Sequence, residues 1–272
     1  MILFSNAKIN IGLLILGKRN DGFHEISTAM VPIPLKDIIE LNIADKSEGD
    51  FSLEQTGIII PDKLEDNLCY KSWKLFCETA GEIQVKMHLH KRIPVGAGLG
   101  GGSSNAVAVL TGLNKLTGNT LNGNDIHHLA TQLGSDCAFF IENTPALAAG
   151  RGEILSSLPV SLKGYYLVLL NPGTSIDTAW AYKKAYPNKK REPLDMLLSK
   201  PIETWKTTVS NDFESIVFES YPEVAGLKAE LYLAGAIFTS MSGSGSTVYG
   251  LFREEPKLNQ GLRKNLLWQG RL

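Results

Sequence analysis

The spacing of apolar and polar residues predicts the main strands and helices of the chain. Residues 83–93 (IQVKMHLHKRI) alternate apolar and polar positions, which is typical of a half-buried strand, and residues 106–116 carry apolar side chains on one face of a helix. Other expected strands are 3–16, 38–44, 165–170 and 248–252, and other expected helices are 67–80, 125–133 with Asp125 as its cap, 177–185, 202–209 and 222–234. This mixed order predicts an α+β fold rather than a regular parallel sheet.

A glycine-dense segment, residues 94–105, joins the strand at 83–93 to the helix at 106–116. Five glycines between residues 96 and 102 remove the side chains that would hold a ligand away from the backbone, and Ser103 and Ser104 can cap the helix. A helix N-terminus offers unpaired N–H donors and about +0.5 of an elementary charge, so this segment suits a phosphate group. A flexible linker is the alternative, but linkers do not normally join a regular strand to a regular helix.

Two better-known phosphate motifs fit this segment poorly. The Walker type needs a lysine followed by serine or threonine at its end, and no lysine follows Gly102. Gly96, Gly98 and Gly101 formally match a dinucleotide fingerprint, but that motif continues into a second strand ending in an acidic residue. Residues 117–123 form a polar turn instead.

Composition bounds the class of protein. The 272 residues suit one large or two ordinary domains, with an expected boundary between residues 157 and 158. A formal net charge of -1 argues against bulk nucleic-acid or anionic-membrane binding, and no apolar run approaches the roughly 20 residues of a membrane helix. We therefore expect a soluble, cytoplasmic protein. The three cysteines Cys69, Cys77 and Cys137 form no C-x-x-C pair, so we expect buried thiols without a zinc site.

Four further segments carry residues suited to chemistry. Lys8 and Asn10 lie two apart in an apolar strand and so share a face, and His24 follows a turn and an aromatic residue. Asp136 precedes an apolar stretch, and residues 241–247 form a second Gly/Ser loop before an expected strand. Lysine in an apolar run is expensive to bury unless it is paired.

Each of these residues also has an ordinary structural interpretation. Lys8 could extend its ammonium group to the surface, Asp136 could cap a helix, and His24 could be a surface residue. His88 and His90 share a strand face without a third metal ligand at suitable spacing, and we interpret them as surface residues. Together with a phosphate loop, however, a lysine and an aspartate suit phosphoryl transfer, the aspartate taking the proton of a hydroxyl while the lysine offsets phosphoryl charge.

These segments resemble the GHMP small-molecule kinases. The similarity is carried, in order and across nearly the whole chain, by residues 7–10, 18–25, 94–105, 133–136, 150–153 and 242–246. It implies an N-terminal domain (1–157) of the ribosomal-S5-domain-2-like type, a C-terminal ferredoxin-like domain (158–272), and an active site between them. It also implies MgATP-dependent phosphorylation of a small molecule, the tertiary 2-hydroxyl of methylerythritol in a cytidine diphosphate conjugate.

The same resemblance implies roles for individual residues. Asp136 would be the catalytic base with Lys8 as its partner, and no motif assigns the ligands of Mg²⁺. Expected substrate contacts are Asn10, Phe23, His24, Thr178 and Tyr182, with Phe23 stacking on the cytosine, His24 bonding it and Tyr182 lying opposite Phe23. Expected ATP contacts are Asn67, Leu68, Lys91, Pro94, Val95, Gly96, Ala97, Gly98, Leu99, Gly100, Gly101, Gly102, Ser103, Ser104 and Asn105.

The sequence departs from the family pattern at three places. Phe23 stands where tyrosine is commoner, Cys137 and Ala138 stand where Val-Pro is frequent, and Asp177 takes the place of a serine. Two alternatives stay open. The first is a kinase of another alcohol, such as homoserine or a sugar, although a compact alcohol needs no aromatic clamp for a base. The second is a nucleotide-binding module without catalysis. Neither composition nor motif indicates an oligomeric state.

Overall fold

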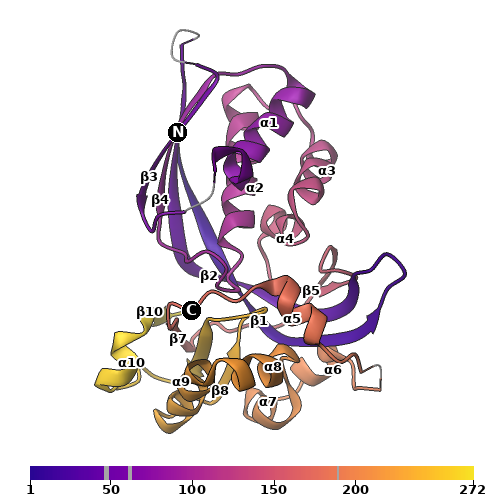
Figure 1. Cartoon of the computed structure of the whole chain (residues 1–272), viewed down its shortest axis with the longest axis vertical. Helices are drawn as coiled ribbons and strands as arrows, with labels where there is room; N and C mark the ends of the chain where they lie inside the picture. The colour runs from indigo at the N-terminus through magenta and orange to yellow at the C-terminus, as the bar shows by residue number, and fades with distance from the viewer. Residues whose placement is uncertain (46–48, 61–62, 189) are drawn as a thin grey trace. The chain divides into compact units, whose positions relative to one another are not determined.

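The computed structural model describes residues 1–45, 49–60, 63–188 and 190–272, coloured along the chain in Figure 1. They form two compact units that share the two longest strands, β1 (Ile2–Lys18) and β2 (His24–Ile43). The first unit comprises Met1–Ala7, Pro34–Val95 and Gly100–Asn143, and the second comprises Lys8–Ile33, Gly96–Leu99 and Thr144–Leu272. Strands and helices are interspersed in both units, so the expected α+β class is confirmed.

The first unit packs helices on one face of a sheet (Figure 1). Strand β4 (Val85–Lys91) runs parallel to β3 (Phe51–Gly57) and antiparallel to the second half of β2, with Ile38 opposite His90. Buried side chains of α2, among them Val109, Leu110 and Leu113, supply much of its core. Its helices are the 3-10 helix η2 (Leu64–Asp66), α1 (Leu68–Ala80), α2 (Gly101–Leu116), α3 (Gly123–Leu133) and α4 (Cys137–Glu142).

The second unit contains a four-stranded antiparallel sheet in the order β10-β7-β9-β8. The first half of β2 pairs with β5 (Ala146–Ala149), which pairs with β6 (Ile154–Ser157). The strands of the four-stranded sheet are β7 (Tyr166–Leu170), β8 (Phe238–Met241), β9 (Val248–Phe252) and β10 (Leu266–Arg271). The helices are α5 (Thr178–Lys184), α6 (Leu194–Leu198), α7 (Ile202–Thr208), α8 (Phe213–Ser220), α9 (Pro222–Leu233) and α10 (Gln260–Lys264).

Several expected elements are confirmed with changed ends. The strand expected at 83–93 is the shorter β4, and the strand expected at 38–44 is the second half of β2. The expectation that Asp125 caps a helix is wrong, because Asn122 is the N-cap of α3 and Asp125 closes a capping box from the third helical position. The elements that the sequence pattern did not predict are β3, β5, β6, β8, β10, η2, α4, α6, α8 and α10.

The compact units do not follow a single cut in the sequence. We expected one boundary between residues 157 and 158, whereas 144–157 and most of β1 belong to the second unit. Within the described ranges, no helix is long and apolar enough to cross a membrane.

Gly112 marks a close approach of α2 to strands β1 and β2 in the first unit. A Cβ atom there would lie 2.6 Å from Leu3 Cδ1 and 2.8 Å from Leu41 Cδ1. We expect Gly112→Val to lower the free energy of unfolding by about 1–3 kcal/mol, because an overpacked core must shift. The measurement is urea denaturation.

Gly123 provides the matched control, since a Cβ at this helix start meets nothing within 4 Å. Gly123→Val should change the free energy of unfolding by no more than about 0.5 kcal/mol. Equal losses in both variants would show that packing at Gly112 is not the constraint.

Candidate active site

The glycine segment links β4 to α2, as its sequence predicts, but the helix begins earlier than expected. It starts at Gly101 rather than at Ala106, and Gly100 is its N-cap with φ of 69°. Ser103 and Ser104 therefore lie inside the first turn, so the expectation that they cap the helix is wrong. In the described part of the chain, no side chain caps α2. Its first backbone N–H groups are consequently the donors that this end of the helix offers to an anion.

The middle of the segment, residues 96–99, packs against the second Gly/Ser loop within the second unit. The Ser242 hydroxyl donates to the Gly98 carbonyl at 2.7 Å, and the Thr247 amide donates to the Ala97 carbonyl at 3.3 Å. Gly98 has φ of 74°, and a Cβ atom there would lie only 1.9 Å from the Ser242 carbonyl oxygen. Only glycine fits this position.

Lys8 and Asn10 form the centre of a buried polar group on β1. Their exposed fractions are 3% and 2%, so the interpretation of Lys8 as a surface lysine is wrong. The Lys8 ammonium donates to Asn10 Oδ1, and Asn10 Nδ2 donates to the Thr28 hydroxyl at 3.0 Å. The Thr28 hydroxyl in turn donates to the Gly12 carbonyl at 2.6 Å. This chain of donors fixes the orientation of the Asn10 amide and so the position of the Lys8 ammonium group.

Three of the expected ATP contacts, Asn67, Leu68 and Lys91, lie together in the first unit, around the start of α2. Asn67 is the N-cap of α1 and accepts a hydrogen bond from the Cys69 amide at 2.9 Å. A Cβ atom on Gly102 would lie 3.3 Å from Leu68 Cδ1, and one on Gly101 would lie 2.9 Å from Lys91 Nζ. Leu68 and Lys91 therefore both border the glycine segment.

The Lys91 side chain is almost inaccessible to solvent and forms an ion pair with Asp37. No sequence motif pointed to Asp37. The exposed fractions of the two side chains are 1% and 0%. Burial lowers the pKa of Lys91, and the neighbouring Asp37 carboxylate opposes this shift. Enclosure of the ammonium group favours a supporting role under the glycine segment over direct side-chain contact with a nucleotide.

Asp136 directly precedes α4 in the first unit, whereas Lys8 belongs to the second. Its side chain makes no capping hydrogen bond to α4, so the interpretation of Asp136 as a helix cap is not supported. Cys137 follows it and is fully buried.

Among the residues that the structure describes, no three His, Cys, Asp or Glu side chains form a cluster that could hold a metal ion.

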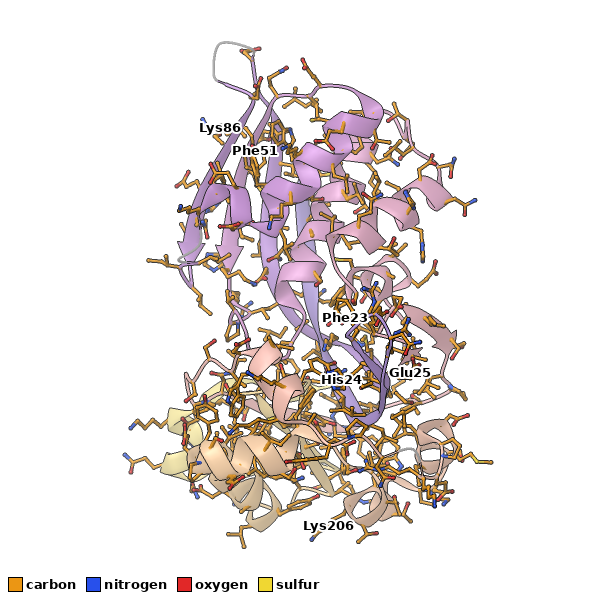
Figure 2. The ribbon with its side chains drawn as sticks, turned by 45° about the vertical axis from the view of Figure 1, so that its right-hand side comes forward. Phe23, His24, Glu25, Phe51, Lys86 and Lys206 are labelled. Carbon is orange, nitrogen blue, oxygen red and sulfur yellow. The ribbon has the colours of Figure 1, made fainter. Side chains whose placement is uncertain are left out.

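The turn before β2 presents the residues expected to bind cytosine, and Figure 2 shows Phe23, His24 and Glu25 beside one another. The Arg19 amide donates to the Phe23 carbonyl at 2.8 Å, and the Arg19 guanidinium group binds the Glu25 carboxylate at 2.9 Å. Phe23 is 53% exposed, and the guanidinium carbon of Arg151 lies 4.7 Å from the centre of its ring. This cation–π contact occupies one face of Phe23.

The imidazole of His24 stacks on the ring of Tyr182, with centroids 5.1 Å apart and planes 20° apart. The expectation that Tyr182 contacts the substrate opposite Phe23 stays a prediction. Burial, with a smaller contribution from Lys18, lowers the pKa of His24 and favours its neutral form. On α5, the Thr178 hydroxyl lies 2.8 Å from the Ser244 hydroxyl, and Asp177 caps the helix through the Ala179 amide.

Sequence reasoning gave no role to three residues that hold these groups in place. Arg151 lies in a segment that carried the family resemblance, but its contact with Phe23 joins distant parts of the chain. Ser242 and Asp37 likewise act through long-range contacts.

The histidines His88 and His90 both bond the Thr56 hydroxyl, at 2.9 and 3.0 Å.

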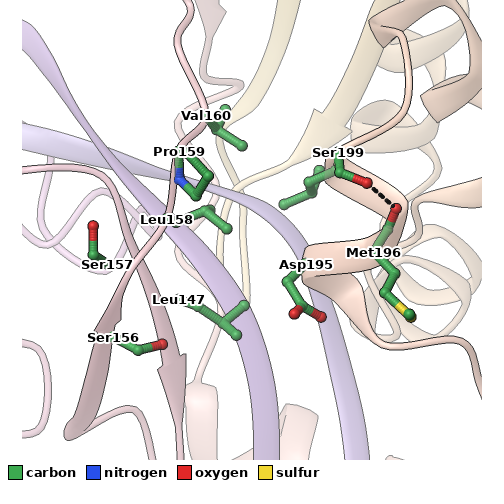
Figure 3. A pocket seen from close by; sticks show the side chains of 10 residues that line it. Leu147, Ser156, Ser157, Leu158, Pro159, Val160, Asp195, Met196 and Ser199 are labelled. Carbon is green, nitrogen blue, oxygen red and sulfur yellow. Dashed lines mark hydrogen bonds between the residues drawn. The ribbon is translucent and has the colours of Figure 1, made fainter.

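A separate pocket of the second unit is shown in Figure 3. Among the described residues, none of the expected site residues lines it. Its lining residues are Leu147, Ser156, Ser157, Leu158, Pro159, Val160, Asp195, Met196, Leu198 and Ser199.

Comparisons with known proteins identify the family of this chain. A family model described as the N-terminal domain of GHMP kinases matches residues 67–143, and one described as the C-terminal GHMP kinase domain matches residues 197–265. The chain therefore belongs to the GHMP kinase family, small-molecule kinases that use ATP as the phosphate donor, and the expected two-domain architecture is confirmed.

Within that family, the relatives that match over nearly their full length include 4-diphosphocytidyl-2-C-methyl-D-erythritol kinases. The protein of that name from Bacteroides thetaiotaomicron is 42% identical over 95% of this chain and 94% of its own. That from Cytophaga hutchinsonii is 44% identical over 94% of each chain. A crystal structure of 4-(cytidine 5'-diphospho)-2C-methyl-D-erythritol kinase has a TM-score of 0.77 and 31% identity, covering 92% of this chain and 90% of its own.

The structure of homoserine kinase from Cytophaga hutchinsonii shares the fold at lower identity. Its TM-score is 0.64 and its identity 19%, over 97% of this chain and 87% of its own.

The three thiols should differ in reactivity. Burial raises the pKa of Cys69 to about 12 and that of Cys137 to about 11, so both are protonated at pH 8. Cys77 is only half-buried, which corrects the expectation of three buried thiols. We expect a disulfide reagent at pH 8 to modify Cys77 first, and mass spectrometry of the labelled peptides checks this.

Cys77→Ser is the control for this prediction. It should remove the fast phase of labelling, and the two buried thiols should react fully only in denaturant. Fast labelling of Cys137 in the native protein would contradict the burial described for this residue beside Asp136.

Proposed function

We propose that this protein transfers the γ-phosphoryl group of MgATP to the 2-hydroxyl of 4-diphosphocytidyl-2-C-methyl-D-erythritol. The reaction is a step of non-mevalonate isoprenoid precursor biosynthesis, and it takes place in the cytoplasm, where ATP is supplied. The observation that carries the proposal is identity above 40% to kinases of that name over nearly the whole chain. The turn that exposes Phe23 beside His24 supports the choice of a nucleobase-containing acceptor.

The glycine segment binds the phosphates of ATP. The amides at the start of α2 donate to phosphate oxygens, and the glycines at 96, 98 and 100 let the backbone approach them. Mg²⁺ would arrive with ATP and offset the charge of its phosphates. Because Mg²⁺ is usually held by one or two carboxylates together with substrate phosphates, a dedicated protein cage is not required.

Asp136 and Lys8 carry the chemical step. The 2-hydroxyl oxygen attacks the γ-phosphorus, its proton passes to the Asp136 carboxylate, and the bond from the γ-phosphorus to the bridging oxygen breaks to release ADP. The Lys8 ammonium, aimed by Asn10, offsets the charge on the transferred group. A tertiary alcohol is a crowded nucleophile, so alignment matters, and well-oriented reactants can recover about 7–11 kcal/mol of barrier.

The cytidine end of the acceptor binds at the turn before β2. Phe23 stacks on the cytosine with its ring face that Arg151 does not cover, and neutral His24 hydrogen-bonds the base edge while Tyr182 supports its imidazole. Thr178 contacts the acceptor near the second Gly/Ser loop. Its hydroxyl is hydrogen-bonded to Ser244 of that loop.

The proposal is tested by ADP release from MgATP with purified protein. The cytidine conjugate is set against homoserine, galactose and mevalonate as acceptors. Turnover with the conjugate alone supports the assignment. Turnover with another alcohol would make the protein a kinase of that alcohol, and turnover with none would leave a nucleotide-binding module.

Asp136→Asn should lower kcat by about 10²- to 10⁴-fold, because a positioned base contributes roughly that factor. The KM for MgATP should stay within a few-fold of the wild-type value. Asp66→Asn, which neutralises a solvent-exposed carboxylate of the same unit, is the control and should leave kcat unchanged. Wild-type turnover by Asp136→Asn would remove this residue from the role of base.

Phe23→Ala should raise the KM for the cytidine conjugate by about 5- to 150-fold. Stacking of a base on an aromatic ring is worth roughly 1–3 kcal/mol. The KM for MgATP should not change. Phe4→Ala is the matched control, because Phe4 is similarly exposed at 61% and is no part of the proposed site. Equal effects of the two substitutions on the KM would contradict a specific role for Phe23.

A further inference from the structure

Asp37 is a fully buried carboxylate on β2 whose hydrogen-bonding capacity is used up by the protein itself. Its side chain is 0% exposed. Oδ1 accepts from the backbone amides of Arg92 at 2.7 Å and Ile93 at 2.8 Å. Oδ2 accepts from the Lys91 ammonium group and from Asn105 Nδ2, the latter at 2.9 Å. A carboxylate offers about four acceptor sites, so all of them are filled.

The four donors lie at the two ends of the glycine segment. Arg92 and Ile93 immediately precede Pro94, where the segment begins, and Asn105 ends it within the first turns of α2. Asn105 Nδ2 also donates to the Ser5 hydroxyl at 2.7 Å, which fixes the orientation of its amide. One carboxylate therefore holds both ends of residues 94–105 to the same strand of the first unit.

Lys91 balances the charge of Asp37 at the start of α2. Ile38 pairs with His90, so Asp37 and Lys91 continue that antiparallel register by one residue. The Lys91 ammonium group lies 2.9 Å from the point where a Gly101 side chain would begin. A buried ion pair is weak evidence for a gain in stability, since a well-packed apolar pair often serves as well. This pair is instead distinguished by the backbone amides that its carboxylate holds.

We propose that Asp37 is a positioning residue for the nucleotide phosphates. By fixing Arg92 and Ile93 relative to Asn105, it sets the separation between the entry of the glycine segment and the amides at the start of α2. It touches no ligand itself, because its side chain is fully enclosed. The inference rests on the proposed function only in taking ATP as the phosphate donor, and misplacement of binding groups by about 1 Å can cost about 10²-fold in rate.

The test is Asp37→Asn, which preserves size but places an amide nitrogen where Oδ2 accepted. The KM for MgATP should rise by about tenfold or more, as expected for loss of hydrogen bonds to a charged group, while the KM for the cytidine conjugate stays within about twofold. The dissociation constant of MgADP, measured by calorimetry without any acceptor, should rise in parallel. Binding of adenosine, which lacks phosphates, should not change.

Asn114→Ala is the matched control at the other end of α2. Asn114 also holds backbone groups, donating to the Leu121 carbonyl at 3.0 Å and accepting from the Leu121 amide at 2.9 Å. It should lower stability without altering MgADP affinity. A folded Asp37→Asn protein that binds MgADP like Asn114→Ala and wild type would overturn the proposal.

A measurement on the wild-type protein keeps the proposal testable should Asp37→Asn not fold. In hydrogen exchange without nucleotide, the amides of Arg92 and Ile93 should be protected as strongly as those of β4. If they exchange as fast as the amides of Gly96 and Gly98, Asp37 does not hold the segment and the proposal fails. Because MgADP binding and exchange involve no acceptor, neither result depends on whether the cytidine conjugate is the substrate.

Discussion

Two backbone segments of the second unit approach each other closely at Gly98 and Ser242. The positions of the candidate site residues in this unit depend on that contact. A side chain at Gly98 would collide with the Ser242 carbonyl, and the Ser242 hydroxyl donates to the Gly98 carbonyl. The same hydroxyl accepts from the Asn10 backbone amide at 3.1 Å. Through Asn10, this contact extends to Lys8 and Thr28, so the glycine segment and the Lys8 ammonium group are held by one hydrogen-bonded group.

The second Gly/Ser loop owes its position to the sheet of the second unit. It lies between β8 and β9, whose side chains are buried throughout, and Asn211 donates to the carbonyls of Met241 and Gly243, both at 2.8 Å. A buried backbone carbonyl is costly without a donor, so Asn211 stabilises the backbone at the start of this loop. The core of this unit therefore serves the site by fixing a loop rather than by lining it.

The sequence identified local features well, since their physical causes are local. The alternation in β4, the glycine segment and the helix expected at 177–185 each depend on neighbouring residues, and the structure contains all three elements. The start of α2 was placed too late because glycine disfavours helix interiors, yet tertiary packing carries the helix back through Gly102 and Gly101. Short strands such as β5 and β8, each of four residues, show too few alternations to reveal a period.

Long-range contacts set the limit of what the sequence could predict. Lys91 was interpreted as a nucleotide contact, but its partner Asp37 is 54 residues away in the chain. Arg151 lies over Phe23 although no local pattern relates the two. The family resemblance predicted which residues bind ligands. The residues that position them, such as Asp37 and Arg151, could be identified only from the fold.

The division of β1 and β2 between the two compact units has a consequence for how such an enzyme can change. The chain passes from one unit to the other within both strands and again within the glycine segment, so neither unit is a contiguous piece of sequence. A gene segment encoding one unit could not be exchanged for a homologous one without cutting both strands and the glycine segment. New specificities in this architecture should therefore have arisen by substitutions in place rather than by shuffling of domains.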